Sequence, residues 1–359
     1  MSLTSRAYAL RYAPAKARLL VRAAGDTRRA AGHYGVSHAA TFARAFDLYR
    51  RHGFGLHESV DYGLLDPAAP RTPPTLSKRR MLALQATHNP AAMEIVTEDK
   101  IVFDAYCRAA GLPVAPTVGV LAHDGPGWMD GVPGPVTADG WAAALDAAPA
   151  PFVVKPAHGA LGRDVRVVVR DERGLRDLTD GPVSPGELAG RLAARPVHAW
   201  VVQRRLHNHP AMQGLGAPEA LITSRIVTVR DGDHASVWFA VVRVPRGGVV
   251  DNISAGGVEV HVDLVTGTLT HGVAKAEDAV GVVRLDRHPA GGPWDRWAVP
   301  DWDDAVGLAL RAARAFAPMV VVGWDVASTP DGPVLIEGNA WADPPYALPP
   351  GPFPAPLSR

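Results

Sequence analysis

The strongest constraint on the fold is a pair of apolar segments joined by a turn near the C-terminus. Residues 320–327 are rich in β-branched side chains, residues 329–332 read Thr-Pro-Asp-Gly, and residues 334–336 form a second apolar run. Apolar runs separated by a Pro-Asp-Gly turn predict two antiparallel strands. A chain with this hairpin must contain at least part of a sheet.

The predicted hairpin brings three oxygen-bearing side chains together. Alternate residues of a strand point to the same side, so Asp325 on the first strand and Glu337 and Asn339 on the second are expected to share one face. Mg²⁺ prefers oxygen ligands and is often held by one or two carboxylates plus phosphate oxygens. The hairpin therefore predicts a magnesium site that also faces a nucleotide.

A second segment predicts where phosphates bind. Residues 152–154 form a short apolar strand that ends at Lys155, and a loop containing Gly159 and Gly162 leads into another strand at 165–169. Glycines let backbone N–H groups approach an anion closely, and a lysine adds a point charge. The loop joins two strands, and the chain contains no G-x-x-x-x-G-K-[S/T] string, so a nucleotide fold other than the P-loop fold is predicted.

These segments occur in an order that resembles a known superfamily. In chain order they are Asp99-Lys100, Lys155-Pro-x-x-Gly159-x-x-Gly162-x-Asp164-Val165, Gln203, Arg225, Asn252 with Gly256-Gly257, and Asp325 through Glu337-x-Asn339. The set resembles the ATP-grasp superfamily over roughly Glu98 to Pro345. More narrowly, it is similar to the sugar-transfer-associated, or glutamate-ligase-related, ATP-grasp proteins.

The resemblance implies a fold, two cofactors and a role for each site residue. The fold is α+β, with two α+β subdomains that hold ATP between them and a mainly helical region before them, and the cofactors are ATP and Mg²⁺. The implied phosphate and nucleotide ligands are Lys100, Lys155, Gly159, Gly162, Gln203, Arg204, Leu206 and Arg225. The implied metal ligands are Asp325, Glu337 and Asn339, and the implied catalytic residues are Arg225, Asn252 and Lys155.

The chain departs from the resemblance at the ribose. Many relatives place a glutamate at or just after the adenine-binding segment, whereas this chain has Arg204, Arg205, His207 and His209 there. Either histidine, or Glu219 folding back, is a candidate for the ribose hydroxyls.

The activity implied by the resemblance is that of an ADP-forming ligase. The γ-phosphate of ATP activates a carboxylate, and an amine attacks the acyl phosphate to give an amide, ADP and phosphate. Two alternatives stay open: a kinase that phosphorylates a sugar or another small-molecule hydroxyl, and a nucleotide-binding module without catalysis in polysaccharide assembly. The substrates are expected to be small molecules, and Arg243, Lys275 and His288 are candidates for an acceptor pocket.

Changes in sequence pattern predict three regions. Residues 1–95 read as a basic, mainly helical region, residues 96–345 as the nucleotide-binding domain, and residues 346–359 as a proline-rich tail. The central region divides further into 96–150, 151–206 and 207–345. Within it we expect helices at 100–109 and 301–316, and strands at 114–120, 221–229, 237–244 and 258–262.

Composition restricts the surroundings in which the chain works. Of 359 residues, 47% are hydrophobic, yet no apolar run approaches the roughly 20 residues of a transmembrane helix. Residues 1–24 lack the continuous apolar segment of a secretory signal, and the single cysteine, Cys107, excludes an intrachain disulfide. We therefore expect a cytoplasmic protein without a transmembrane segment.

The N-terminal region is basic. Residues 1–95 contain 14 Lys and Arg residues against 6 Asp and Glu residues, and this charge predicts docking on the acidic remainder, on a membrane surface or on an anionic substrate. No nucleic-acid motif accompanies the cluster Lys78-Arg79-Arg80, so no nucleic-acid partner is predicted. A homodimer through the N-terminal helices is compatible with the pattern.

Overall fold

The computed structural model describes residues 24–159, 162–247, 256–277 and 280–348, together with Pro354 and Leu357. The predictions for Asn252, for most of residues 1–24 and for most of the tail fall outside these ranges. The chain divides into two compact units, one made of Met1–Leu84, Val273–Arg284 and Asp343–Pro350, the other of Gln85–Gly272, Leu285–Ala342 and Gly351–Arg359. The predicted region boundaries stay a prediction. No helix within the described ranges has the length and apolarity needed to cross a membrane.

The first unit is mainly helical, as the sequence predicts. Residues 24–33 are helical, and the helices α2 (His38–His52) and α3 (Leu56–Asp61) follow, with α4 (Lys78–His88) beginning in the same unit. The Ser37 hydroxyl caps the start of α2, and Gly53, with a φ of 79°, ends it in the left-handed conformation that glycine adopts without strain. The buried core of this unit consists of Ala30, Ala45, Leu48, Phe54, Val60, Leu64, Leu65 and Val280.

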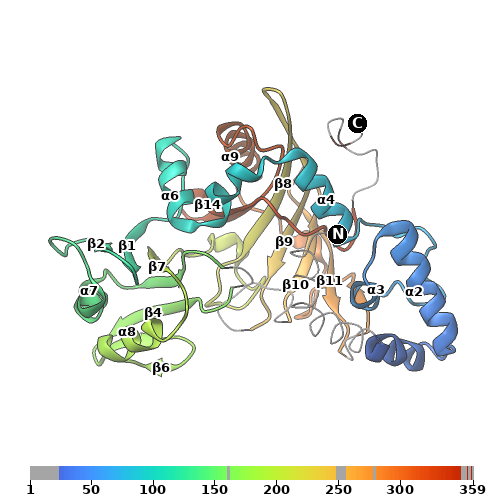
Figure 1. The fold of residues 1–359 in the computed structure, drawn as a ribbon, viewed down its shortest axis with the longest axis horizontal. Helices are drawn as coiled ribbons and strands as arrows, with labels where there is room; N and C mark the ends of the chain where they lie inside the picture. The colour runs from blue at the N-terminus through green and yellow to red at the C-terminus, as the bar shows by residue number, and fades with distance from the viewer. Residues whose placement is uncertain are drawn as a thin grey trace, which may run out of the picture. The chain divides into compact units, whose positions relative to one another are not determined.

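The second unit contains a sheet in which every neighbouring pair of strands is antiparallel. Its order is β2-β1-β7-β3-β4-β5-β6, seen in green in Figure 1. The strands are β1 (Thr117–Ala122), β2 (Trp128–Met129), β3 (Phe152–Pro156), β4 (Arg166–Asp171), β5 (Gly174–Asp177), β6 (Gly181–Pro182) and β7 (Ala199–Arg204).

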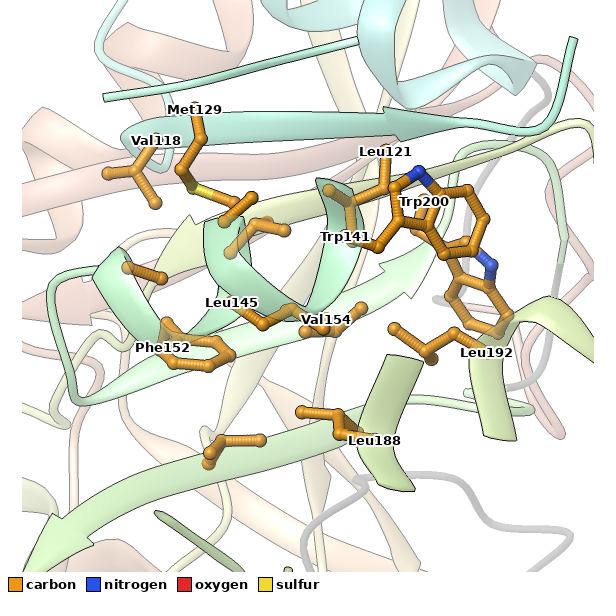
Figure 2. Packing of buried hydrophobic residues seen from close by; sticks show 14 of the residues in the cluster. Val118, Leu121, Met129, Trp141, Leu145, Phe152, Val154, Leu188, Leu192 and Trp200 are labelled. Atoms are coloured by element: carbon orange, nitrogen blue, oxygen red, sulfur yellow. The ribbon is translucent and has the colours of Figure 1, made fainter. Parts of the chain in front are cut away.

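Two helices supply the other half of this sheet's core. Figure 2 shows side chains of α7 (Trp141–Ala147) and α8 (Pro185–Ala193) directed toward those of β1, β3 and β7. Trp141, Phe152 and Trp200 are at most 1% exposed in this cluster. Burying aromatic side chains of this size contributes several kcal/mol each, so this core holds both helices firmly against the sheet.

A second antiparallel sheet follows along the chain in the order β12-β11-β10-β9-β8-β13-β14. Its strands are β8 (Thr223–Asp231), β9 (His234–Val244), β10 (Val258–Val262), β11 (Leu269–Lys275), β12 (Val282–Leu285), β13 (Val321–Thr329) and β14 (Gly332–Asn339). Helix α9 (Trp302–Ala315) packs on one face of it, and Phe316 just after the helix meets Trp324 edge to face at 5.1 Å. The opposite face of β13, which carries Asp325, does not face this helix.

The elements confirm the α+β class and correct several boundaries. The remaining helices are α5 (Glu94–Glu98) and α6 (Lys100–Ala109), and α6 and β10 have the predicted bounds. The strand expected at 114–120 begins at Thr117 instead, because Pro113 and Pro116 cannot donate to a ladder. Helix α9 begins one residue late because Asp301 stands before it in a left-handed conformation with a φ of 50°.

One buried side chain, Asn89, ties the second sheet to the chain that precedes it. Its amide nitrogen donates to Val321 O at 2.8 Å and to Ala340 O at 3.2 Å. Its amide oxygen accepts from Val320 N at 2.9 Å and from Val321 N at 3.0 Å. An asparagine offers two donors and one carbonyl acceptor, and here all of them are used. This side chain fixes the start of β13 and the chain after β14.

Candidate active site

The predicted hairpin is present, and it places the three oxygen-bearing side chains as expected. Asp325 on β13 lies directly opposite Glu337 on β14, and Gly323 lies opposite Asn339. Residues that face each other across antiparallel strands project to the same side. Asn339 also donates to Gly323 O at 3.4 Å. The face opposite to α9 therefore carries two carboxylates and an amide.

Two arginines from neighbouring strands hold Asp325. Arg225 on β8 donates through Nε to one carboxylate oxygen and through Nη2 to the other at 2.9 Å, and Arg243 on β9 donates to that second oxygen at 3.2 Å. Asp325 and Arg225 are 3% and 5% exposed. Burial alone would raise the pKa of Asp325, but the charges of Arg225 and Arg243 and the hydrogen bonds from Arg225 hold that pKa below its usual range. Asp325 is thus a fixed anion at neutral pH.

Lys100 reaches this face from the first turn of α6. The Asp99 carboxylate caps α6 by accepting from Ile101 N and Val102 N, and Lys100 N donates to Ala157 O at 2.8 Å. The Lys100 ammonium donates to Gly159 O at 3.0 Å and lies 3.7 Å from a carboxylate oxygen of Glu337. Figure 1 shows α6 beside β14. Lys100, Gly159 and Glu337, predicted separately, are therefore neighbours.

Lys155, at the end of β3, is a buried cation. It is 7% exposed, and its ammonium has neither a hydrogen bond nor an ion pair with any residue that the structure describes. Burial, and after it the neighbouring charge of Lys100, lower the pKa of Lys155 to about 8, against the opposing charges of Glu337, Asp325 and Asp104. An incompletely paired cation in such a place is costly to the folded state and favours an anionic ligand.

The four cations outnumber the two carboxylates. Lys100, Lys155, Arg225 and Arg243 surround Asp325 and Glu337, so the face carries a net charge of about +2 when all six groups are ionised. The sequence contains 37 basic residues, of which only five are lysines, and two of those five lie here. Lysine is a compact point charge whose pKa responds to burial, whereas arginine stays charged. The site combines both kinds of cation around a space suited to a polyanion.

The donor set fits Mg²⁺. Asp325 and Glu337 supply carboxylate oxygens, and Asn339 supplies an amide oxygen, which is the ligand chemistry that this hard cation takes together with water and phosphate. Glu337 is the accessible member, with its side chain 29% exposed. No cluster of three or more His, Cys, Asp or Glu side chains arranged to hold a metal occurs among the described residues. The protein ligands alone are therefore too few to form a closed site, and a phosphate ligand would complete it.

The glycine loop after β3 is described in part. Gly159 is in place, and Gly162 has a φ of 64°, which L-residues with side chains rarely adopt. Asp164, with a φ of 59°, forms an ion pair with Arg195 at 2.7 Å. Left-handed backbone of this kind is common where successive N–H groups converge on an anion.

The predicted adenine segment ends β7, and its side chains have partners within the sheet. The Gln203 side chain is 4% exposed and donates to Thr117 Oγ1 at 3.1 Å and to Ala115 O at 3.3 Å. Arg204 N donates to Pro116 O at 2.8 Å. Among the described residues, no hydrogen bond or ion pair joins Arg204 or Leu206 to the cluster around Asp325. The contribution of this segment to adenine binding stays a prediction.

The ribose candidates differ in their partners. The ring nitrogen Nδ1 of His209 accepts from Ala211 N at 3.1 Å and caps a short helical turn. Glu219 pairs with Arg205 at 2.5 Å. The exposed His207 side chain forms no hydrogen bond or ion pair within the described part of the chain, so it is the candidate with the fewest competing contacts.

Sequence reasoning gave Arg243 no motif, yet it is the one acceptor-pocket candidate that contacts Asp325. Lys275 pairs instead with Asp61 at 3.4 Å, and His288 is buried with its ring nitrogen Nε2 2.9 Å from Leu215 O.

Glu98 is a further charged residue near the site that the sequence did not indicate. Burial raises the pKa of its carboxyl, and the nearby charges of Glu337 and Glu94 add to the effect. No local pattern signals these contacts, because the partners lie far apart in the sequence.

Comparison with known proteins gives a family match and more remote likenesses. A methionine import ATP-binding protein of Nocardia farcinica is 36% identical over 88 residues, which cover 24% of this chain and 26% of that protein. An L-amino acid ligase of Bacillus licheniformis matches in structure with a TM-score of 0.39 and 14% identity, covering 74% of this chain and 46% of that chain. An N5-carboxyaminoimidazole synthase of Aspergillus clavatus, in complex with ADP and 5-aminoimidazole ribonucleotide, matches with a TM-score of 0.38 and 11% identity, covering 74% and 51%.

The chain spans about a quarter of that curated relative and about half of these two structures. Likenesses of this strength carry no argument about activity. The family model is different, because it matches residues 79–345, which include both sheets and every residue of the site described above. The chain belongs to the sugar-transfer associated ATP-grasp family.

Proposed function

We propose that the protein is an ATP- and Mg²⁺-dependent ligase that joins a small-molecule carboxylate to an amine and releases ADP and phosphate. The observation that carries this proposal is Lys155, a buried ammonium near Lys100 that has no hydrogen bond or ion pair among the described residues. A triphosphate would supply the missing negative charge. Membership of the ATP-grasp family supports the same ligand.

The roles follow from charge and position. Lys100 and Lys155 would neutralise phosphate oxygens, and Glu337 and Asn339, with Asp325, would hold Mg²⁺, which shields the charge of the transferred phosphoryl group when bound. Arg225, held in place by Asp325, would stabilise with its positive charge the negative charge that develops on the transferred phosphoryl group. Because Asp325 orients both arginines before substrate arrives, the site needs little reorganisation during the reaction.

Product analysis tests the proposal. The purified protein is incubated with Mg-ATP and a pool of amino acids, short peptides and sugar derivatives, and ADP, free phosphate and new masses are measured together. A ligase gives ADP, phosphate and a condensed product that has lost water. ADP with a phosphorylated product and no free phosphate would identify a kinase instead and overturn the proposal.

A matched pair of variants tests the metal assignment. Glu337→Gln removes an ionised ligand and is expected to lower turnover by at least about 100-fold. Glu172→Gln makes the same chemical change in the exposed turn between β4 and β5 and is expected to leave turnover unchanged. Retained turnover of Glu337→Gln with magnesium would disprove the role of Glu337.

A further inference from the structure

The site residues lie on one row that crosses the second sheet. Glu337 is opposite Asp325, Asp325 is opposite Arg225, Arg225 is opposite Val241, and Val241 is opposite His261. Directly opposed residues of antiparallel strands project to the same face. His261 on β10 therefore shares a face with Asp325 and Arg225, although no sequence motif marks it.

The next row on the same face repeats this arrangement. Two residues along β9 from Val241 stands Arg243, which binds Asp325, and its partner on β10 is Glu259. Residues two apart in a strand point the same way. Glu259 and His261 thus continue the charged surface beyond the two arginines, on the side away from β14.

Glu259 and His261 form a cluster with a second histidine. The rings of His261 and His271 stack with centroids 4.4 Å apart and planes inclined by 3°, and Nε2 of His261 lies 3.8 Å from a carboxylate oxygen of Glu259. The Glu259 and His261 side chains are 15% and 14% exposed. Both side chains are thus largely buried but keep an exposed part, although Nε2 of His261 is itself buried.

The chemistry of this cluster differs from that of the rest of the face. The β14 end of the row carries magnesium-type ligands with Lys100 of α6 nearby, and the middle carries arginines, whereas the β10 end carries a carboxylate and two imidazoles. A carboxylate attracts an ammonium group, and a neutral imidazole accepts a proton near pH 7. Among the described residues the cluster is not arranged to hold a metal ion. Its chemistry favours a protonated amine.

Spacing also suits a second substrate. Neighbouring strands lie about 4.8 Å apart, so β10 is roughly 10 Å from β8. Val241 lies between Arg225 and His261 on this face, so an acyl phosphate at the arginines and a nucleophile at His261 would meet across its side chain. No other described strand position on this face brings a carboxylate and an imidazole together beyond the arginines.

We propose that Glu259, His261 and His271 form the binding site for the amine substrate, which arrives as a primary ammonium group. The proposal rests on the ligase activity proposed above. The ammonium group gives one proton to solvent, its nitrogen then forms the new C–N bond, and the C–O bond to phosphate breaks with its electron pair leaving on the phosphate. The second proton of the nitrogen passes to the imidazole of His261. Glu259 binds the ammonium before attack, and His271 supports the His261 ring through stacking.

Two products distinguish a defect in amine binding from a defect in carboxylate activation. Hydroxylamine captures an acyl phosphate as a hydroxamate without needing a built amine site, whereas the condensed product needs one. With Mg-ATP and the amino-acid and peptide pool, His261→Ala and Glu259→Gln are expected to lower the condensed product at least about 10-fold while hydroxamate formation stays within about two-fold of the wild type. His234→Ala, an exposed histidine at the start of β9, is the matched control. Equal losses of both readouts, or no loss of either, would overturn the proposed amine site.

A binding measurement keeps the two proposals apart. Glycinamide carries an ammonium group and no carboxylate, and it is expected to shift the ring resonances of His261 and His271, assigned by their loss in the His261→Ala and His271→Ala proteins. Ring shifts without any hydroxamate would uphold the amine site and reject the ligase. Hydroxamate formation without ring shifts would uphold the ligase and reject the amine site.

Discussion

At the scale of single residues, two buried charged side chains differ in their effect on the stability of the folded protein. Asp325 is buried with two arginine partners, and its charge is fully compensated. Lys155 is also buried, but its ammonium has no such partner in the described part of the chain. A residue that lowers stability without a local partner is a candidate for ligand binding.

Replacement of Lys155 is expected to separate stability from binding. Lys155→Met keeps most of the length of the side chain and removes the buried charge, so the free energy of unfolding at pH 7 should rise by about 2–3 kcal/mol. Affinity for ATP should fall at least about 10-fold, because a charge-assisted contact to phosphate is lost. Denaturant unfolding and calorimetric titration measure the two effects.

Lys275→Met is the matched control for this experiment. Lys275 is partly exposed and paired with Asp61, so its replacement should change stability by less than about 1 kcal/mol and leave ATP affinity unchanged. A Lys155→Met protein that is both less stable and still binds ATP would show that the lysine has a structural role.

Cys107 provides a residue-level test of burial. It is fully buried in α6, and burial together with the nearby charge of Asp104 raises the pKa of its thiol to about 12. The thiolate is the reactive form, so the native protein should react with iodoacetamide far more slowly than the unfolded chain does. Mass spectrometry of alkylated protein with and without denaturant checks this. Fast labelling of the native protein would mean that α6 opens readily.

At the scale of elements, the sequence predicted what depends on local signals. The β13–β14 hairpin follows from two apolar runs around a Pro-Asp-Gly turn, and α6 has the bounds of the helix predicted at 100–109. The ATP-grasp fold was predicted from the order of such segments. Its family is confirmed by a model that matches residues 79–345.

Contacts between distant elements were not predictable in the same way. Arg225 and Arg243 lie 100 and 82 residues from Asp325 in the chain, and their meeting depends on the pairing of β8, β9 and β13. A register shift between Val227 and Thr228 and another between Asp325 and Val326 adjust that pairing. Single-sequence patterns do not specify such irregularities. The roles of the site residues and the region boundaries stay predictions.

Among the polar residues that connect separate elements, Asn89 is expected to contribute most to the free energy of unfolding. Asn89→Ala leaves two carbonyls and two N–H groups of the chain around β13 and β14 without this partner, and we expect a loss of about 2–4 kcal/mol in the free energy of unfolding. Asn89→Asp keeps the acceptor and removes both donors, so it should also destabilise, more strongly at pH 7 than at pH 4. Denaturant unfolding measures both variants.

Asn208→Ala is the matched control for Asn89. Asn208 is a partly buried asparagine whose side chain forms one hydrogen bond with Ala220 O and one with Ile222 N, so its replacement should cost less stability. Equal stability of Asn89→Ala and the wild type would contradict the role assigned to Asn89.

At the scale of the whole molecule, the composition leaves few groups that titrate in mildly alkaline solution. The chain has a formal net charge of +1, and arginine supplies most of its positive charge, since only five basic residues are lysines. Arginine does not titrate below about pH 12. The Cys107 thiol does titrate near pH 8.5 in the unfolded chain, and its raised pKa in the folded protein lowers stability as pH rises. A variant without Lys155 carries the same cysteine, so a comparison of the two proteins isolates the lysine.

The sign of the expected pH dependence follows from proton binding. The pKa of Lys155 is about 8 in the folded protein, against an ordinary value of 10.5. Above pH 8 the unfolded chain therefore binds more protons at this residue, and the contribution of Lys155 to stability should rise with pH toward about 10. The difference in unfolding free energy between Lys155→Met and the wild type should shrink over this range. A constant difference from pH 7 to 10 would reject the lowered pKa.

Because the site residues form a row across the second sheet, the geometry of the site depends on the register of the strands. Each of its residues comes from a different strand, and a slip of one residue in any strand would turn that strand's contribution to the opposite face. The apolar side chains beneath α9, such as Trp324, are what make such a slip unfavourable. Substitutions in that apolar layer, on the face of the sheet opposite to the charged groups, should therefore appear in genetic screens as losses of catalysis as well as losses of stability.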